Sequence, residues 1–142
     1  MANNRNITSA NATLIMIVDE LYPQGVTLQQ FSTDAMASEA DETFAETRMG
    51  VDGQMVAGYV DAVKSITVTL EPSSPSIEYL NTLANAMRTN KQVYPVTLLI
   101  SIPATGRNIT CSNGVLKTGK ILPDMNKTLQ PIAYTFDFES VA

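Results

Sequence analysis

Three segments of the chain alternate between apolar and polar residues, and this pattern restricts the possible folds more than any other feature. They are residues 65–71, 94–102 and 132–139. Because successive side chains of a strand point to opposite faces, each segment predicts a strand with one face on a core and one in water. Residues 13–18 form a run in which every residue after Thr13 is apolar, and they predict a strand buried on both faces. The chain is therefore expected to be mainly β.

One segment has helical periodicity instead and predicts a single α-helix over about residues 76–89. Ser76 is predicted to be its N-cap, and Glu78 lies in the first turn, where the helix dipole favours an acid. The apolar residues of the segment would form one stripe facing the sheet: Ile77, Leu80, Leu83, Ala84 and Met87. With seven to nine strands expected, we predict one domain over residues 1–142, an antiparallel β-sandwich or barrel with one packed helix and a polar N-terminal arm over residues 1–12.

Residues 34–61 predict a long extended hairpin. Asp52-Gly53 is a strong signal for a two-residue turn, since both central positions of such a turn need a positive φ. That turn would place Met49 opposite Val56, with an apolar face on one side and charged and aromatic residues on the other. An isolated hairpin is marginally stable in water, so either the core of the domain or another copy of the protein should cover it. Asn113-Gly114 predicts a second hairpin, joining residues 107–112 to residues 115–122.

Composition excludes several classes of function. The chain carries a formal net charge of −5, whereas a nucleic-acid-binding module needs a cationic surface. It has no histidine and one cysteine, Cys111, so the usual general base and the usual metal ligands are missing. Without a histidine to activate it, Cys111 is expected to point into the core and not to act as a nucleophile. Asp137 and Glu139 lie two apart on one strand face, where a solvated surface explains them better than a catalytic pair. We expect no enzyme, no cofactor, no metal site and no membrane segment.

The chain resembles the tail tube proteins of contractile-tailed bacteriophages. The resemblance rests on residues 42–60, residues 65–71, Ser74-Pro75-Ser76 and residues 129–138, which follow the order of that family over nearly the whole chain. The family implies a β-sandwich with one helix, related to the tube proteins of type VI secretion systems and pyocins. In that family hexameric rings stack into a hollow tube through which DNA passes, and a long hairpin reaches toward the neighbouring ring.

This resemblance implies a structural virion protein of the tail, assembled in the host cytoplasm. Its partners would be further copies of itself, the tail sheath, the baseplate and terminator proteins, and passing DNA that is not bound by sequence. The expected contacts between subunits and between rings are Glu46, Arg48, Met49, Val51, Asp52, Met55 and Val56.

A lumen that carries DNA should be polar and negative, so that phosphates do not adhere to it. The candidate lumen-lining residues are Asp41, Glu42, Asp61, Glu71, Asp137 and Glu139. Two other functions remain open for a chain of this type. One is a soluble β-sandwich binding or baseplate module, and the other is a secretion-system tube protein with protein cargo.

Overall fold

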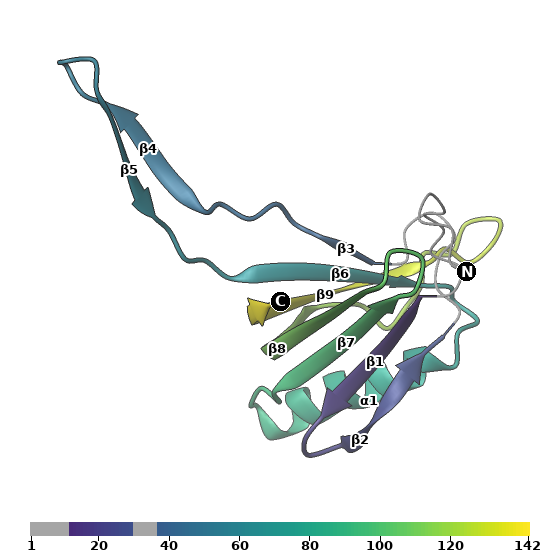
Figure 1. Ribbon diagram of the computed structural model, residues 1–142. Helices are drawn as coiled ribbons and strands as arrows, with labels where there is room; N and C mark the ends of the chain where they lie inside the picture. The colour runs from purple at the N-terminus through teal and green to yellow at the C-terminus, as the bar shows by residue number, and fades with distance from the viewer. Residues whose placement is uncertain (1–11, 30–36) are drawn as a thin grey trace.

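A computed structural model describes residues 12–29 and 37–142 of the chain, drawn as a ribbon in Figure 1. Its elements in these ranges are β1 (Thr13–Val18), β2 (Tyr22–Leu28), β3 (Ala37–Glu39), β4 (Ala45–Met49), β5 (Met55–Tyr59), β6 (Lys64–Leu70), α1 (Ser76–Asn90), β7 (Val96–Ile102), β8 (Arg107–Thr118) and β9 (Ile132–Val141). The predicted arm, except for its last residue, and the first residues of the predicted 34–61 hairpin lie outside the described residues.

Seven of these strands form one antiparallel sheet in the order β2-β1-β7-β8-β9-β6-β3. The sheet curls into a half-barrel, and α1 packs against one of its faces. The predicted fold class, a mainly β antiparallel architecture with one packed helix, is confirmed. The remaining strands, β4 and β5, form a separate two-stranded ribbon that projects from the body of the molecule (Figure 1).

The core lies between the sheet and α1. It is built from the alternate residues of each strand, as the sequence pattern predicted: Ile66, Val68 and Leu70 of β6 are buried, and their neighbours in the strand are half-buried. On β9 the rings of Phe136 and Phe138 stack with their centroids 6.1 Å apart. The prediction for residues 13–18 was wrong in one respect. Only alternate residues of β1 are fully buried, because the second face of the sheet has no covering layer in the described chain.

The start of α1 is held by two serines and the end of β2. Ser76 is not the N-cap as predicted, since Pro75 takes that place and Ser76 is the first helical residue. The Ser76 hydroxyl accepts a hydrogen bond from the Gln29 backbone N–H at 2.8 Å. Ser74 donates its hydroxyl to the Gln29 carbonyl and accepts the Ser76 N–H. Both serines are buried, and their hydroxyls connect the start of α1 to the end of β2 more than they cap the helix.

The predicted hairpin at Asn113-Gly114 is also wrong. Residues 107–118 form one continuous strand, β8, which pairs with β7 on one side and β9 on the other. Asn113 has φ +53, and the pairing register with β7 shifts between Val96 and Leu98, so the dipeptide forms a β-bulge. Gly114 is needed there because a Cβ would lie 2.1 Å from a ring carbon of Phe138. The Asn113-Gly114 dipeptide therefore forms a bulge within one strand and not the turn of a hairpin.

Candidate functional site

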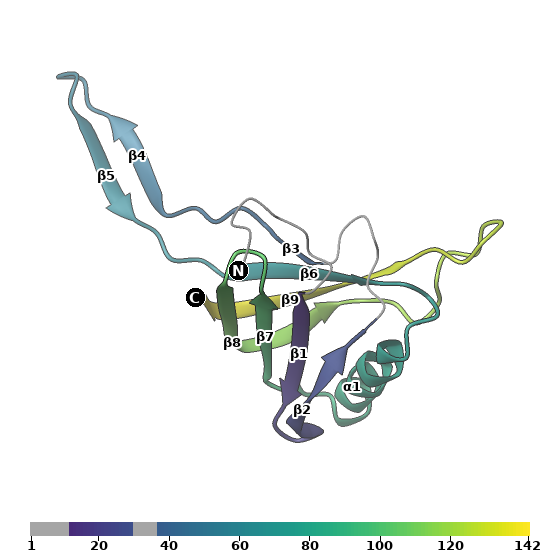
Figure 2. The same cartoon turned by 45° about the vertical axis from the view of Figure 1, so that its right-hand side comes forward.

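The candidate site is the projecting ribbon formed by β4 and β5. Figure 1 and Figure 2 show it extending well away from the sheet and from α1. These two strands pair with each other and with no other strand of the described chain. All ten of their residues are exposed, so both faces of the ribbon are open to solvent. The predicted extended hairpin is present in the part of residues 34–61 that the structure describes.

The turn of this hairpin differs from the prediction. Arg48 pairs with Val56 and Met49 with Met55, so the register is shifted by one residue. The Gly50 N–H then donates to the Gln54 carbonyl at 2.8 Å, which leaves a loop of three residues, 51–53. The reason is local: Gly53 alone takes a positive φ, +84°, while Asp52 stays in the ordinary region. A first turn closes from the Gly53 N–H to the Gly50 carbonyl at 3.0 Å, and Gly53 then forms the bulge typical of three-residue hairpins.

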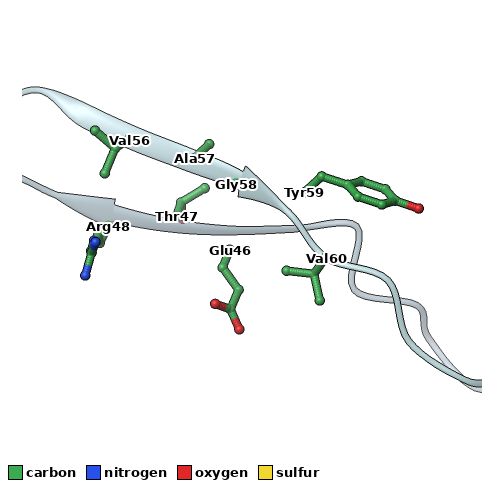
Figure 3. Close-up of a pocket in the computed structure, with 8 residues that line it drawn as sticks. All are labelled: Glu46, Thr47, Arg48, Val56, Ala57, Gly58, Tyr59 and Val60. Carbon is green, nitrogen blue, oxygen red and sulfur yellow. The ribbon is translucent and has the colours of Figure 1, made fainter.

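This shift changes which side chains share a face. One face, called here the uncharged hairpin face, consists of Ala45, Thr47, Met49, Met55, Ala57 and Tyr59. The other face carries Glu46, Arg48, Val56 and Val60, which point to the same side in Figure 3, whereas Thr47, Ala57 and Tyr59 do not. The predicted pairing of Met49 with Val56 is wrong. A one-residue change of register exchanges the faces of one strand relative to the other.

The hairpin exposes several large apolar side chains. Val51 at its tip is fully exposed, and Tyr59 is 81% exposed. Phe44, Met49, Met55 and Val56 are also more than half exposed. Exposed apolar side chains gathered on one projecting element are typical of a site of contact with another protein. The expected contact residues Met49, Val51, Met55 and Val56 are thus all available on the hairpin, as are Glu46, Arg48 and Asp52.

The acidic residues predicted to line a lumen divide into two groups. Five of them gather around the base of the hairpin, where two adjoining hollows are lined in part by Asp41, Glu42, Asp61, Asp137 and Glu139. Glu71 does not join them, because it follows the opposite end of β6. Lys64 lies among the five: its ammonium donates to Asp61 at 2.8 Å and to the Glu139 carbonyl at 3.2 Å.

The electrostatics at this base are dominated by these contacts. The hydrogen bond from Lys64, together with its positive charge, lowers the pKa of Asp61 and in turn raises the pKa of Lys64. Nearby, Glu39 has a raised pKa because it is partly desolvated and shares a hydrogen bond with the like-charged Glu42. Like charges held this close favour the protonated form of one of them. The base is therefore negative, but one lysine offsets part of the charge.

The open face of the sheet, opposite α1, is rich in hydroxyl groups. Ser65 donates to Asp137 at 2.6 Å, and the hydroxyls of Thr67 and Thr135 lie 3.3 Å apart. Lys117 lies 3.5 Å from the second oxygen of Asp137. Cross-strand partners thus neutralise the one carboxylate in the middle of this face.

Cys111 is in the core, as the sequence predicted, and burial raises the pKa of its thiol to about 11. The described residues hold no cluster of three or more His, Cys, Asp or Glu side chains suited to a metal ion. Across residues 12–29 and 37–142, no helix is long and apolar enough to cross a membrane.

Sequence reasoning missed one surface. The loop between β8 and β9, residues 119–131, exposes four large apolar side chains: Ile121, Leu122, Met125 and Leu129. The signal available was the adjacent pair Ile121-Leu122 in an otherwise polar segment, next to Pro123.

The sequence as a whole matches one protein family, described as tail fiber protein gp32, over residues 5–142. The chain belongs to the tail fiber protein gp32 family. Membership makes it a phage-tail-like structural protein, which confirms the coarser part of the predicted identity and function. The gp32 family name refers to a tail fiber and not to a tail tube. A search of curated proteins found no match.

Solved structures share the fold of this gp32 family member over almost its whole length. A chain of the sheath/tube terminator of the extracellular contractile injection system PVC has 14% identity and a TM-score of 0.61, covering 96% of this chain and 95% of that one. A chain of the anti-feeding prophage baseplate has 12% identity and a TM-score of 0.57, with 100% and 96% covered. A chain of the anti-feeding prophage tube-terminating cap has 16% identity and a TM-score of 0.56, with 100% and 93% covered.

Proposed function

We propose that this protein is a self-assembling structural subunit of a phage tail, forming hexameric rings that stack into the hollow inner tube for DNA passage. The observation that carries the proposal is the hairpin of β4 and β5, whose two faces are both open to solvent. Such a ribbon is marginally stable alone, and its apolar side chains need a partner surface. A copy in the neighbouring ring would provide that surface.

Ring formation is supported by the edges of the sheet. In the described chain the half-barrel ends at β2 on one side and at β3 on the other. β3 has three residues and pairs with residues 66–68 of β6, so it covers only part of that strand. Unpaired edge groups favour pairing with another chain, and a closed ring of copies would remove these edges. Contacts between different surfaces of identical subunits generate such rings.

The lumen is assigned in this proposal to the open face of the sheet and the acidic base of the hairpin. Asp41, Glu42, Asp61, Asp137 and Glu139 lie near that base, and Glu71 at the far end of β6 would lie apart from them. The lysines on these surfaces, Lys64 and Lys117, are each paired with a carboxylate, and the hydroxyls beside them are neutral, so DNA phosphates meet little unpaired positive charge. DNA would then pass without sequence-specific contact. The sheath, the baseplate and the terminator would be the other partners in a virion tail assembled in the host cytoplasm.

The second candidate is a binding or baseplate module of a tail fibre, which the family name favours. A secretion-system tube with protein cargo is a variant of the first candidate, with the same assembly. Electron microscopy of the purified full chain, in negative stain from low to high concentration, separates assembly from non-assembly. Hollow six-fold rings or tubes are expected. A chain that stays monomeric at every concentration would contradict the self-assembly proposal and favour the fibre module.

A further inference from the structure

The loop between β8 and β9 is a second protruding apolar surface, and it lies at the end of the molecule opposite the hairpin. Figure 1 and Figure 2 both show it on the far side of the sheet from the hairpin tip. The loop has a defined shape: Lys120 and Asp124 form an ion pair at 2.9 Å, and the Gln130 N–H donates to the Asp124 carbonyl at 3.0 Å. Leu122 in this loop is 66% exposed.

A groove runs beside this loop, between the second half of α1 and the end of β8. Met87, Leu116 and Tyr134 contribute apolar side chains to it. Gly119 lies against the Tyr134 ring, because a Cβ at that position would be 2.6 Å from a ring carbon. The rim of the groove is basic: its lining includes Arg88 and Lys120 and no acid, whereas the ammonium of Lys117 lies beside Asp137 on the open face of the sheet. The groove and the loop residues Ile121, Leu122, Met125 and Leu129 are called here the receptor surface.

The charges of the two ends are complementary. Residues 45–59, which form the hairpin, carry two acids and one base, a net charge of −1. Residues 119–131, which form the loop, carry two bases and one acid, a net charge of +1, and Arg88 adds a further positive charge at the groove. Lys120 has one acidic neighbour, Asp124, and remains substantially exposed. Two copies placed end to end would therefore bring opposite charges together.

We propose that the receptor surface of one copy binds the hairpin tip of a second copy. This proposal rests on the proposed function, in which the hairpin mediates stacking, and it names the surface that the hairpin contacts. Val51 and the two methionines beside the turn would enter the apolar groove. Asp52 uses one carboxylate oxygen for the Gln54 N–H within the turn, at 3.1 Å, and would direct the other to the basic rim. Because the two surfaces lie at opposite ends, the contact repeats along one axis and builds an open filament.

Cross-linking of the full-length chain tests this contact. One preparation carries Val51→Cys, a second carries Ile121→Cys, and the two are mixed, allowed to assemble and treated with a short bismaleimide. Cys111 does not interfere, since it is buried and its thiol is held protonated. A matched control replaces Ile121→Cys by Val93→Cys, at an exposed position on the α1–β7 connection that is outside the receptor surface.

The mixed dimer is expected to exceed the control by about tenfold or more, because an interface holds its two thiols at a high effective concentration. Sedimentation of the same mixtures reports whether they assemble. Polymers without the Val51→Cys to Ile121→Cys product would overturn this inference and leave the proposed function standing. Polymers that cross-link between two Val51→Cys copies would also overturn it, in favour of hairpin-to-hairpin contact. Absence of any polymer would overturn both proposals.

Discussion

Replacing Val51 and Val56 by asparagine should abolish assembly at ordinary concentrations without unfolding the subunit. In the single chain Val51 is fully exposed and Val56 is 54% exposed, and neither belongs to the core cluster. Surface substitutions away from special features usually change stability by less than about 0.5 kcal/mol. Asparagine adds no charge, so the variant tests the burial of apolar surface and not an electrostatic effect.

The size of the effect follows from exposure. Full burial of a valine side chain contributes about 1.5–3 kcal/mol. Val51 has its whole side chain to bury on assembly, and Val56 about half of its own. The pair should therefore contribute about 2–4 kcal/mol to each contact between copies. Since about 1.4 kcal/mol corresponds to a factor of ten, each association constant should fall by about 30- to 1,000-fold.

Sedimentation velocity over a concentration series measures this directly, as the concentration at which polymers first appear. Circular dichroism during heating measures the stability of the unassembled subunit in parallel. Val93→Asn is the matched control, because Val93 is 62% exposed and lies on the α1–β7 connection outside the hairpin. It should leave both measurements unchanged. Polymers of the double variant at the wild-type concentration would show that the hairpin tip is not an assembly surface.

Three further predictions concern the subunit itself. Gly114→Ala should lower the free energy of unfolding by about 1–3 kcal/mol, because the added methyl group would overpack the ring of Phe138. Gly58→Ala is the control, since a Cβ at that position meets nothing within 4 Å. Equal denaturation midpoints for the two variants would contradict the reasoning. Burial raises the pKa of the Cys111 thiol from 9.0 to about 11. The contribution of the protonated thiol to the free energy of unfolding is therefore complete below pH 9, and it should fall by about 1.4 kcal/mol per pH unit as the pH rises from 9 to 11. In urea titrations, the Cys111→Ala variant should not show this loss of stability between pH 9 and 11. The same dependence of unfolding free energy on pH in the variant and the wild-type protein would contradict the prediction. Desolvation, together with the hydrogen bond and the charge of Glu42, raises the pKa of Glu39, so ionised Glu39 destabilises the folded state. Glu39→Gln should therefore raise Tm at pH 7, and the gain should disappear in acid, where Glu39 is protonated. A gain in Tm that persists at pH 3 would refute this.

Much of the local structure could be predicted from the sequence. The period-2 segments became β6, β7 and β9 with the expected faces in the core, and the single helical pattern became α1. The predicted burial of Cys111 holds as well. These features depend on side-chain periodicity against one apolar core, which a chain segment carries in itself. The hairpin was also predicted, but the sequence left open whether the core of the domain or another copy covers its apolar side chains, and the structure shows these side chains exposed.

Other features depended on residues distant in the chain. Asn113-Gly114 satisfies a hairpin turn and a strand bulge equally well, and the Phe138 ring packed over Gly114 selects the bulge. Ser76 could have capped α1, but its hydroxyl is taken by Gln29 at the end of β2. The two faces of the β4–β5 hairpin followed from a register that differs by one residue from the expected one.

The sequence by itself determined most of the strands, the helix, the core-facing residues and the existence of the long hairpin, since these depend on local periodicity and composition. Only the tertiary structure decided which surfaces are neighbours. It gathered acids from three separate segments at the hairpin base. It also set a basic, apolar surface at the opposite end of the molecule from the acidic hairpin. The physical reason is that antiparallel pairing brings together residues far apart in the chain, and no local pattern encodes those distances.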